Sequence, residues 1–224
     1  MNQLTDTGFE IAHAVLSTVE CDKILDQLSE ANIKRSRAGA RHLLFLPFIS
    51  QLATDPRLLN IAGNFLKQKV VPLRVTLFDK SYNSNWLVFW HQDTALPMRQ
   101  RFEAPDWGPW SVKVGIFYAH APTTALSQVI ALRVHLDDST ADNGPLRVLP
   151  GTHMKGVLTD ENVLRLAHSM SSVECTVPKG GVLAMRPLLI HSSSKSQNSA
   201  PRRVLHIEYA RSLILAPGIE LAVA

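Results

Sequence analysis

The sequence feature that most constrains the fold is a series of short β-type runs in the second part of the chain. From Val70 onward, runs rich in β-branched, aliphatic and aromatic residues alternate with stretches of Ser, Asn, Asp, Gly and Pro, the pattern of strands joined by turns. The runs predict eight strands, at residues 70–79, 86–90, 112–118, 129–136, 145–149, 172–177, 181–190 and 202–211. Short strands in this number predict a β-barrel or a two-sheet jelly roll.

Two amphipathic helices are predicted ahead of these strands. Ser17 and Glu20 have the spacing of a capping box, and apolar residues at helical spacing follow them. Asp55 and Pro56 then give the N-cap and first position of a second helix. We therefore expect residues 1–224 to form one mainly β domain with flanking helices, made of a mainly helical N-terminal layer at 1–69 and a β core at 70–211.

Composition and charge exclude several classes of protein. The 224 residues are 46% hydrophobic and 19% charged, as in an ordinary folded chain, and two cysteines are too few for a disulfide scaffold. No apolar run approaches the roughly 20 residues that span a membrane, and the first residues do not have the pattern of a signal peptide, so we expect a cytoplasmic location. The net charge of +4 comes from scattered basic residues, the densest at 34–41, which argues against a nucleic-acid partner. No feature predicts the oligomeric state.

The strongest candidate site is the triplet that begins at His91 and ends at Asp93. In an extended strand, residues i and i+2 point to the same face, so His91 and Asp93 project together and Gln92 points away. An imidazole beside a carboxylate supplies two of the three ligands in the 2-His-1-carboxylate site of non-haem iron. Such a pair is more often a simple hydrogen-bonded pair than a metal site, so the interpretation requires a third ligand.

His191 is the candidate for that third ligand. It ends a strand-like run, and a Ser- and Asn-rich loop then leads to Arg202 and Arg203 at the start of the last predicted strand. A hairpin of this size would bring the start of the last strand beside the end of the preceding one. We therefore expect an arginine near the metal ligands, where its planar, permanently charged group suits a carboxylate.

Four segments together resemble the phytanoyl-CoA dioxygenase family over almost the whole chain, from about Gly8 to Tyr209. They are His91 to Asp93, residues 143–153 (NGPLRVLPGTH), residues 185–193 (MRPLLIHSS) and Arg202. The resemblance implies a double-stranded β-helix, a cupin-like jelly roll. It also implies an Fe(II)- and 2-oxoglutarate-dependent dioxygenase that uses O₂ to hydroxylate a small molecule and releases succinate and CO₂.

The same resemblance implies roles for individual residues. His91, Asp93 and His191 would be the metal ligands and the catalytic centre, and Arg202 and Ser193 would bind 2-oxoglutarate. The choice of Arg202 over Arg203 also depends on strand alternation. Arg203 shares its face with three large apolar residues, and in this architecture the N-terminal helices cover that face, so the opposite, mixed face with Arg202 is expected to line the pocket.

The substrate is an unidentified small molecule. Arg133, Trp110 and Lys113 are candidates to line its pocket. For Arg133 an ion pair with Glu208 is an equal alternative, and a tryptophan beside Gly108 and Pro109, such as Trp110, is more often a packing anchor. The segments 34–41 and 95–110 are predicted to be loops near the pocket. The alternative function is a non-catalytic protein that binds a metal or a carboxylate on the same barrel.

Overall fold

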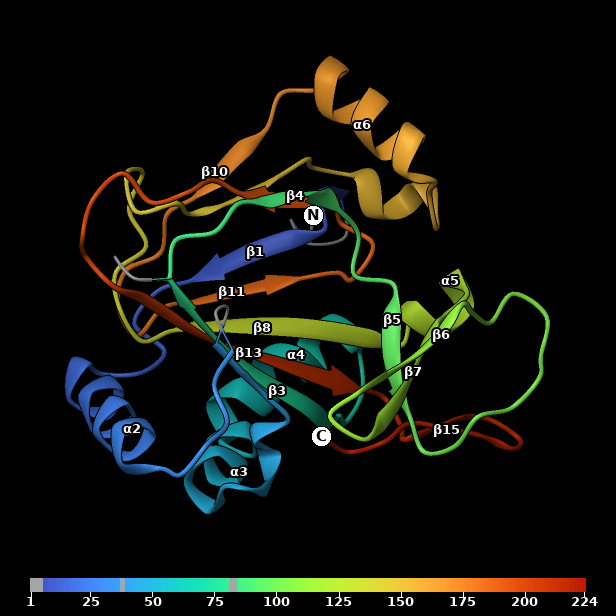
Figure 1. Cartoon of the computed structure of the whole chain (residues 1–224), viewed down its shortest axis with the longest axis horizontal. Coiled ribbons are helices and arrows are strands. Elements are labelled where there is room, and N and C mark those ends of the chain that lie inside the picture. The colour runs from blue at the N-terminus through green and yellow to red at the C-terminus, as the bar shows by residue number, and fades with distance from the viewer. Residues whose placement is uncertain (1–5, 37–38, 81–83) are drawn as a thin grey trace.

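Two antiparallel sheets face each other and form the barrel (Figure 1). The computed structural model describes residues 6–36, 39–80 and 84–224. The six-stranded sheet has the order β1-β11-β8-β13-β3-β2, with β1 (Phe9–Ala12), β2 (Gly39–Arg41), β3 (Val71–Lys80), β8 (Val129–His135), β11 (Val182–Met185) and β13 (Arg202–Ala210). The four-stranded sheet has the order β10-β9-β12-β4, with β4 (Val88–His91), β9 (Leu146–Val148), β10 (Val173–Cys175) and β12 (His191–Ser193). This is the predicted double-stranded β-helix.

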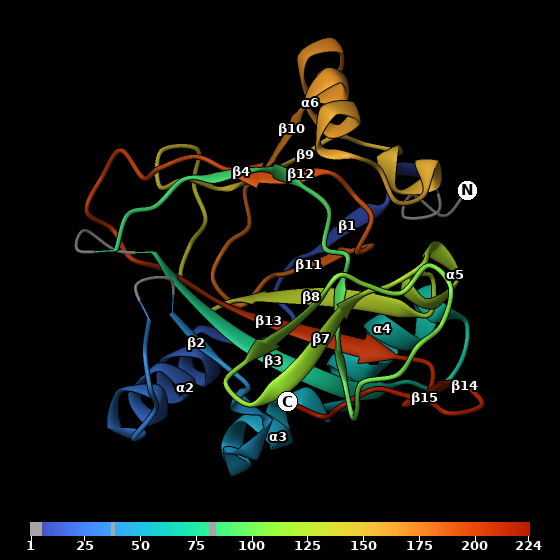
Figure 2. The same ribbon diagram turned by 45° about the vertical axis from the view of Figure 1, so that its right-hand side comes forward.

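Smaller elements complete the fold. A three-stranded sheet of β5 (Ala95–Met98), β6 (Trp110–Lys113) and β7 (Ile116–His120) lies at one end of the barrel (Figure 2). The remaining elements are the hairpin of β14 (Ile214–Ala216) and β15 (Ile219–Glu220), and the helices α2 (Thr18–Glu30), η1 (Leu43–Phe45), α3 (Pro47–Ala53), α4 (Pro56–Leu66), α5 (Thr123–Leu126), η2 (Thr152–Lys155) and α6 (Asp160–Ser169). None of the helices in the described part of the chain has the length and apolar character needed to cross a bilayer.

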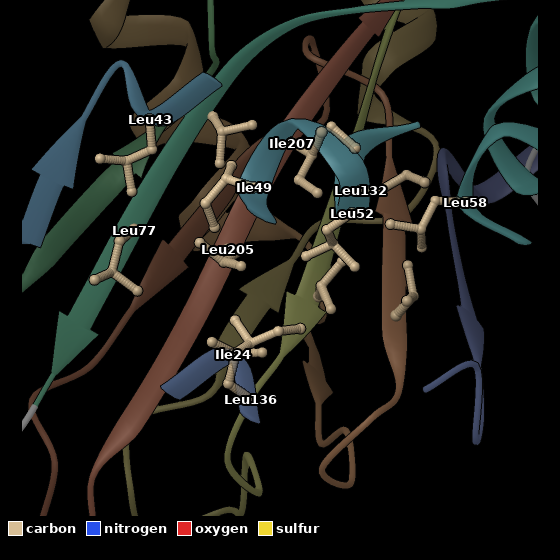
Figure 3. Close-up of a cluster of buried hydrophobic side chains, with 14 of the residues drawn as sticks. Ile24, Leu43, Ile49, Leu52, Leu58, Leu77, Leu132, Leu136, Leu205 and Ile207 are labelled. Carbon is tan, nitrogen blue, oxygen red and sulfur yellow. The ribbon is translucent and has the colours of Figure 1, made fainter. Parts of the chain in front are cut away.

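The N-terminal helices cover the outer face of the six-stranded sheet. The predicted caps are present: Ser17 and Glu20 form the capping box of α2, and the Asp55 side chain accepts a hydrogen bond at the start of α4. Figure 3 shows the apolar cluster between the helices and the sheet, with Leu77, Leu132, Leu205 and Ile207 of the sheet packed against Ile24, Ile49, Leu52 and Leu58. Burial of this surface holds the helices in place and leaves the inner face of the sheet free to form a site.

The barrel interior has an apolar part and a polar part. Side chains of β8, β9, β10 and β11 form a second buried cluster between the sheets, which includes Ala131, Leu146, Val148, Cys175, Leu183 and Met185. Inner-face residues of β3 and β13, opposite β4 and β12, instead line a cavity. The candidate site therefore lies in one part of a barrel whose other part is solid core.

Several predicted boundaries were wrong. The run 112–118 is two strands, β6 and β7, joined at Val114 and Gly115, which both have positive φ and so turn the chain sharply. The run 181–190 is a strand only to Met185, and β12 begins at His191. The segment 95–110 is not a loop throughout, because β5 opens it and β6 begins at its last residue.

The N-terminal layer also differs from the expectation. Residues 6–69 are mainly helical, but they contribute β1 and β2 to the edges of the six-stranded sheet. The helices α3 and α6 were not predicted from the sequence, although both carry apolar residues at helical spacing, Ile49, Leu52 and Ala53 in α3 and Val163, Leu166 and Ala167 in α6. Of the basic segment 34–41, Arg37 and Ala38 lie outside the described residues, and Arg35 pairs with Asp79.

Candidate metal and carboxylate site

Two neighbouring strands bring the three candidate metal ligands together. His91 is the last residue of β4 and His191 the first of β12, and the two are directly opposite in the antiparallel pair. Asp93 follows β4 by two residues, and its backbone N–H donates to the carbonyl of Pro187 at 2.9 Å. One ligand atom from each of the three side chains lies within 4.8 Å of the others, so a single ion can contact all three.

The orientation of both histidines leaves Nε2 available. Nδ1 of His91 is 2.8 Å from the carbonyl of Phe89, and Nδ1 of His191 is 2.9 Å from the carbonyl of Leu189. A proton on each Nδ1 is donated to these carbonyls, which places the lone pair on Nε2. The two Nε2 atoms are 3.7 and 3.6 Å from the two oxygens of Asp93. Two imidazole nitrogens and one carboxylate on one side of a cavity fit a transition-metal ion that keeps open positions.

The protonation states of Asp93 and His191 also suit a metal. Burial lowers the pKa of His191 to about 4, although the charge of Asp93 opposes this effect. For Asp93, burial favours the neutral acid, but the two histidines outweigh it and hold the pKa of the carboxyl well below its usual range. For His91, burial is outweighed by the hydrogen bond and charge of Asp93, so its pKa is raised. At neutral pH Asp93 is therefore ionised and His191 is neutral, as ligands must be.

Gln92 points away from the ligands and bonds two other segments of the chain, one at Leu188 and one at residues 156–158. Its Nε2 donates to the carbonyls of Leu188 at 2.8 Å and Gly156 at 2.9 Å, and its Oε1 accepts from the N–H of Leu158 at 2.9 Å. Leu188 lies just before His191. The side chain between two of the candidate ligands therefore fastens their strand to the segment that carries the third.

Arg202 lies in the same cavity and is nearly inaccessible, with 2% of its surface exposed. Its Nη2 is 3.4 Å from Oγ of Ser193, while its Nε and Nη1 have no hydrogen-bond partner. Burial and the nearby charge of Arg133 lower the pKa of Arg202 to about 9, which still leaves it charged at neutral pH. A buried cation with two unused donors fits an anionic ligand that enters the cavity.

Arg203 points the other way. Its Nε and Nη2 bind both oxygens of Asp137, at 2.7 and 2.8 Å. The apolar residues that share its face pack against the N-terminal helices. The prediction that a hairpin brings Arg202 beside His191 was wrong. The strands β12 and β13 are not paired but belong to opposite sheets, and Arg202 reaches Ser193 across the barrel.

Lys80 is a third polar group beside this end of the cavity, where it contacts the lining residue Ser193 without lining the cavity itself, and it was not predicted from the sequence. It is directly opposite Arg202 on β3, is 1% exposed, and donates to Oγ of Ser193 at 2.9 Å and to the carbonyl of Ser194 at 2.5 Å. Burial, together with Arg202 and Arg133, lowers the pKa of Lys80 to about 7. Gly144 makes room for this contact, because it has φ +72° and an added Cβ would lie 2.4 Å from the carbonyl oxygen of Ser194.

Arg133 projects into the cavity from β8. Its Nη1 is 3.3 Å from Nδ1 of His206, its guanidinium lies 5.2 Å from the ring centre of Phe78, and its Nε has no partner. The alternative that Arg133 pairs with Glu208 is wrong, because Glu208 binds Arg74.

The two remaining candidates are on different sides of β6. Lys113 lines the cavity, whereas Trp110 is not among the residues that line it and packs edge-on against Phe102, with ring centres 5.1 Å apart. The two residues are three apart in one strand, so alternation places them on opposite faces. Trp110 thus belongs to a small apolar cluster around the three-stranded sheet.

The cavity has a volume of about 340 Å³ and contains the candidate ligands, Arg202, Ser193, Arg133 and Lys113. A larger hollow of about 690 Å³ lies between the segment that leads to η1 and the turn of β6 and β7. It contains none of the three candidate ligands and shares only Arg41 with the cavity. The site that can do chemistry is therefore the smaller of the two.

The two facing sheets and the His-Asp-His cluster between them define a double-stranded β-helix protein with a 2-His-1-carboxylate site. The chain belongs to the phytanoyl-CoA dioxygenase (PhyH) family, whose sequence model matches residues 5–204. The family resemblance seen in the sequence is thus confirmed.

Individual relatives agree with this assignment. The chain is 30% identical over 140 residues to an L-proline trans-4-hydroxylase of Streptomyces griseoviridis, a match that covers 51% of this chain and 52% of that protein. The chain thus spans about half the length of this curated relative. The fold is similar to that of EctD from S. alaskensis in its apoform, with a TM-score of 0.70, 20% identity, and coverage of 93% of this chain and 74% of that one. It is also similar to HygX from Streptomyces hygroscopicus with nickel and 2-oxoglutarate bound, with a TM-score of 0.67, 17% identity, and coverage of 92% and 84%.

Proposed function

We propose that this protein is an Fe(II)- and 2-oxoglutarate-dependent dioxygenase that hydroxylates a small molecule and releases succinate and CO₂. The observation that carries the proposal is the presence, in one cavity, of a metal-ligand cluster and a buried arginine with two unused donors. The names of similar proteins support it, since they include a proline hydroxylase and a structure with nickel and 2-oxoglutarate bound.

His91, Asp93 and His191 would hold the iron, which when bound supplies the chemistry that couples oxidative decarboxylation of 2-oxoglutarate to oxidation of a substrate C–H bond. The protein's own contribution is to hold the reactants and exclude water. The carbonyls of Phe89 and Leu189 keep the two imidazoles oriented for coordination.

Arg202 and Ser193 would bind the carboxylate of 2-oxoglutarate that is remote from the metal. Lys80 adds a second cation at the same hydroxyl, and in the described part of the cavity no carboxylate forms an ion pair with Arg202 or Lys80. Charged groups buried without counterions are costly, so a dianion that enters here gains charge-assisted hydrogen bonds and relieves that cost.

The proposal is tested by adding Fe(II) and then 2-oxoglutarate without oxygen and recording the visible spectrum. We expect a weak charge-transfer band in the natural protein, no band in His191→Ala, and an unchanged band in the matched control His168→Ala, whose histidine is exposed on α6. The absence of a band in the natural protein, or a full band in His191→Ala, would show that the proposal is wrong.

Oxygen then separates the proposal from its alternative. A dioxygenase forms succinate from 2-oxoglutarate in air, at least slowly without its substrate, whereas a non-catalytic binding protein on the same barrel shows the band but forms no succinate. We also infer that residues 1–224 act as one domain, because the N-terminal helices and the sheet share one apolar cluster. The cytoplasmic location stays a prediction from the sequence.

A further inference from the structure

The cavity carries more positive charge than the proposed metal and 2-oxoglutarate account for. Its lining contains five cations, Arg41, Arg74, Lys113, Arg133 and Arg202, and Asp93 is the acid among the lining residues. Glu208 adds a second negative charge through its pair with Arg74. A metal dication and the 2-oxoglutarate dianion cancel each other. Three positive charges thus remain without a paired acid. Arg41 is exposed and Lys113 is half-buried, so a further anion can reach these two cations from solvent.

The cations fall into two groups. Arg133 and Arg202 lie with Lys80 at the end assigned to 2-oxoglutarate, where Lys80 and Arg202 both bind Ser193. Arg41 and Lys113 come from separate elements, the edge strand β2 and the small-sheet strand β6. In the β2–β3 pair Arg41 is directly opposite Thr76, which lines the cavity, so both residues face inward.

Arg41 and Lys113 have no acidic partner within 4.0 Å among the described residues. The ammonium group of Lys113 instead lies 4.7 Å from the ring centre of Tyr118. Arg74, another cation of the lining, is already neutralised by Glu208. Burial, followed by the charges of Arg41 and Arg74, lowers the pKa of Lys113. Two unpaired like charges in the lining of one cavity are a suitable environment for an anionic oxygen group.

We propose that the substrate carries an acid group, a carboxylate or a phosphate, that binds between Arg41 and Lys113 while the bond to be oxidised faces His91, Asp93 and His191. The proposal rests on the proposed function and names the chemical class of its substrate. A neutral substrate would leave the half-buried ammonium group of Lys113 without a counterion in the loaded cavity.

The test measures the binding of simple probes by isothermal titration calorimetry to protein loaded with Ni(II) and saturating 2-oxoglutarate. The probes are pentanoate, its neutral counterpart pentanamide, and methyl phosphate. We expect pentanoate to bind at least tenfold more tightly than pentanamide, because the acid gains a charge-assisted contact with each cation. If methyl phosphate binds as well as or better than pentanoate, the acid group is a phosphate, and in the opposite case it is a carboxylate.

Variants then assign the preference to the two residues. Arg41→Gln and Lys113→Met are each expected to weaken pentanoate binding about tenfold and to leave pentanamide binding unchanged, whereas Arg41→Lys and Lys113→Arg keep most of the preference for the acid. Arg211→Gln and Lys69→Met are matched controls, since both residues are exposed and neither lines the cavity. Because Arg41→Lys and Lys113→Arg keep the positive charge, retained binding in these variants shows that the weaker binding of the neutral variants comes from the lost charge and not from misfolding.

Equal binding of pentanoate and pentanamide, or an acid preference that survives in the Arg41→Gln, Lys113→Met double variant, would overturn the proposal. The Fe(II) and 2-oxoglutarate band is recorded on the same protein. A band without any acid preference refutes this inference alone, while the absence of a band refutes the proposed function.

Discussion

Arg202 and Arg203 are adjacent in the sequence but face opposite sides of one sheet, and this offers a sharp test of how the site works. Arg202→Met removes the buried guanidinium and leaves an apolar chain of similar length. Without 2-oxoglutarate, Nε and Nη1 of Arg202 have no partners, so the natural protein gains little from this charge. We therefore expect the free variant to be at least as stable as the natural protein.

With 2-oxoglutarate the outcome reverses. A hydrogen bond to a charged group is worth about 1.5–3 kcal/mol, and Arg202 has two unused donors. Lys80 and Ser193 remain in the variant, so we take the lower value of about 1.5 kcal/mol for each of the two donors. The total loss of about 3 kcal/mol corresponds to roughly 100-fold weaker binding. At a ligand concentration of 100 times the natural dissociation constant, 2-oxoglutarate stabilises the natural protein by about 2.7 kcal/mol and the variant by only about 0.4 kcal/mol.

The assay is chemical unfolding of Ni(II)-loaded protein with and without 2-oxoglutarate, together with calorimetric titration. Arg203→Met is the matched control, because it breaks the pair with Asp137 but removes nothing from the cavity. It is expected to lower the free energy of unfolding by about 1 kcal/mol or less and to leave 2-oxoglutarate binding unchanged. The reasoning is refuted if Arg202→Met binds 2-oxoglutarate within twofold of the natural protein, or if Arg203→Met weakens binding as much.

Two further predictions concern buried groups around the site. Lys80→Met removes the cation that holds Ser193, and we expect about tenfold weaker 2-oxoglutarate binding by calorimetry, with Lys69→Met unchanged; equal affinity in Lys80→Met would contradict a role for Lys80 in the site. His206 has a pKa lowered to about 3, first by burial and then by Arg133. Because the unfolded chain takes up this proton near pH 6.5, stability falls as the pH drops below that value, and at pH 5 the loss is about 2 kcal/mol. The assay is urea unfolding of the metal-free protein at pH 7 and at pH 5. Between these two pH values, the free energy of unfolding of His206→Gln should fall by about 2 kcal/mol less than that of the natural protein. An identical fall in both proteins would contradict the assigned burial effect.

The parts of the site that depend on local geometry could be predicted from the sequence. Residues i and i+2 of a strand face the same side, and this alone placed His91 beside Asp93. The same alternation, with the apolar face given to the N-terminal helices, separates Arg202 from Arg203. His191 was a candidate from its place at the end of a strand-like run, but its role as the third ligand came from the family resemblance, since nothing local to His191 indicates that it is directly opposite His91.

The parts that depend on register or on the path of the chain could not be predicted. Lys80 enters the site because it is directly opposite Arg202 in the β3–β13 pair, and register between strands more than a hundred residues apart is not encoded locally. Trp110 was a candidate for the cavity lining, although a tryptophan beside Gly108 and Pro109 is more often a packing anchor. The turn at Val114 and Gly115 divides the run 112–118 into two strands, and of the β6 residues Lys113 lines the cavity.

The hydrogen bonds of Gln92 bring the two ligand segments together during folding, before a metal binds. His91 and His191 are a hundred positions apart, and joining the ends of so long a loop costs conformational entropy. In a zinc finger, the metal itself overcomes that cost, and the chain unfolds when the metal leaves. Here Gln92 and the N–H of Asp93 already tie the two ligand segments together through backbone groups. The loop between the two histidines is therefore closed when the chain folds. We expect the barrel to stay folded when the metal is removed and to bind the metal again without refolding.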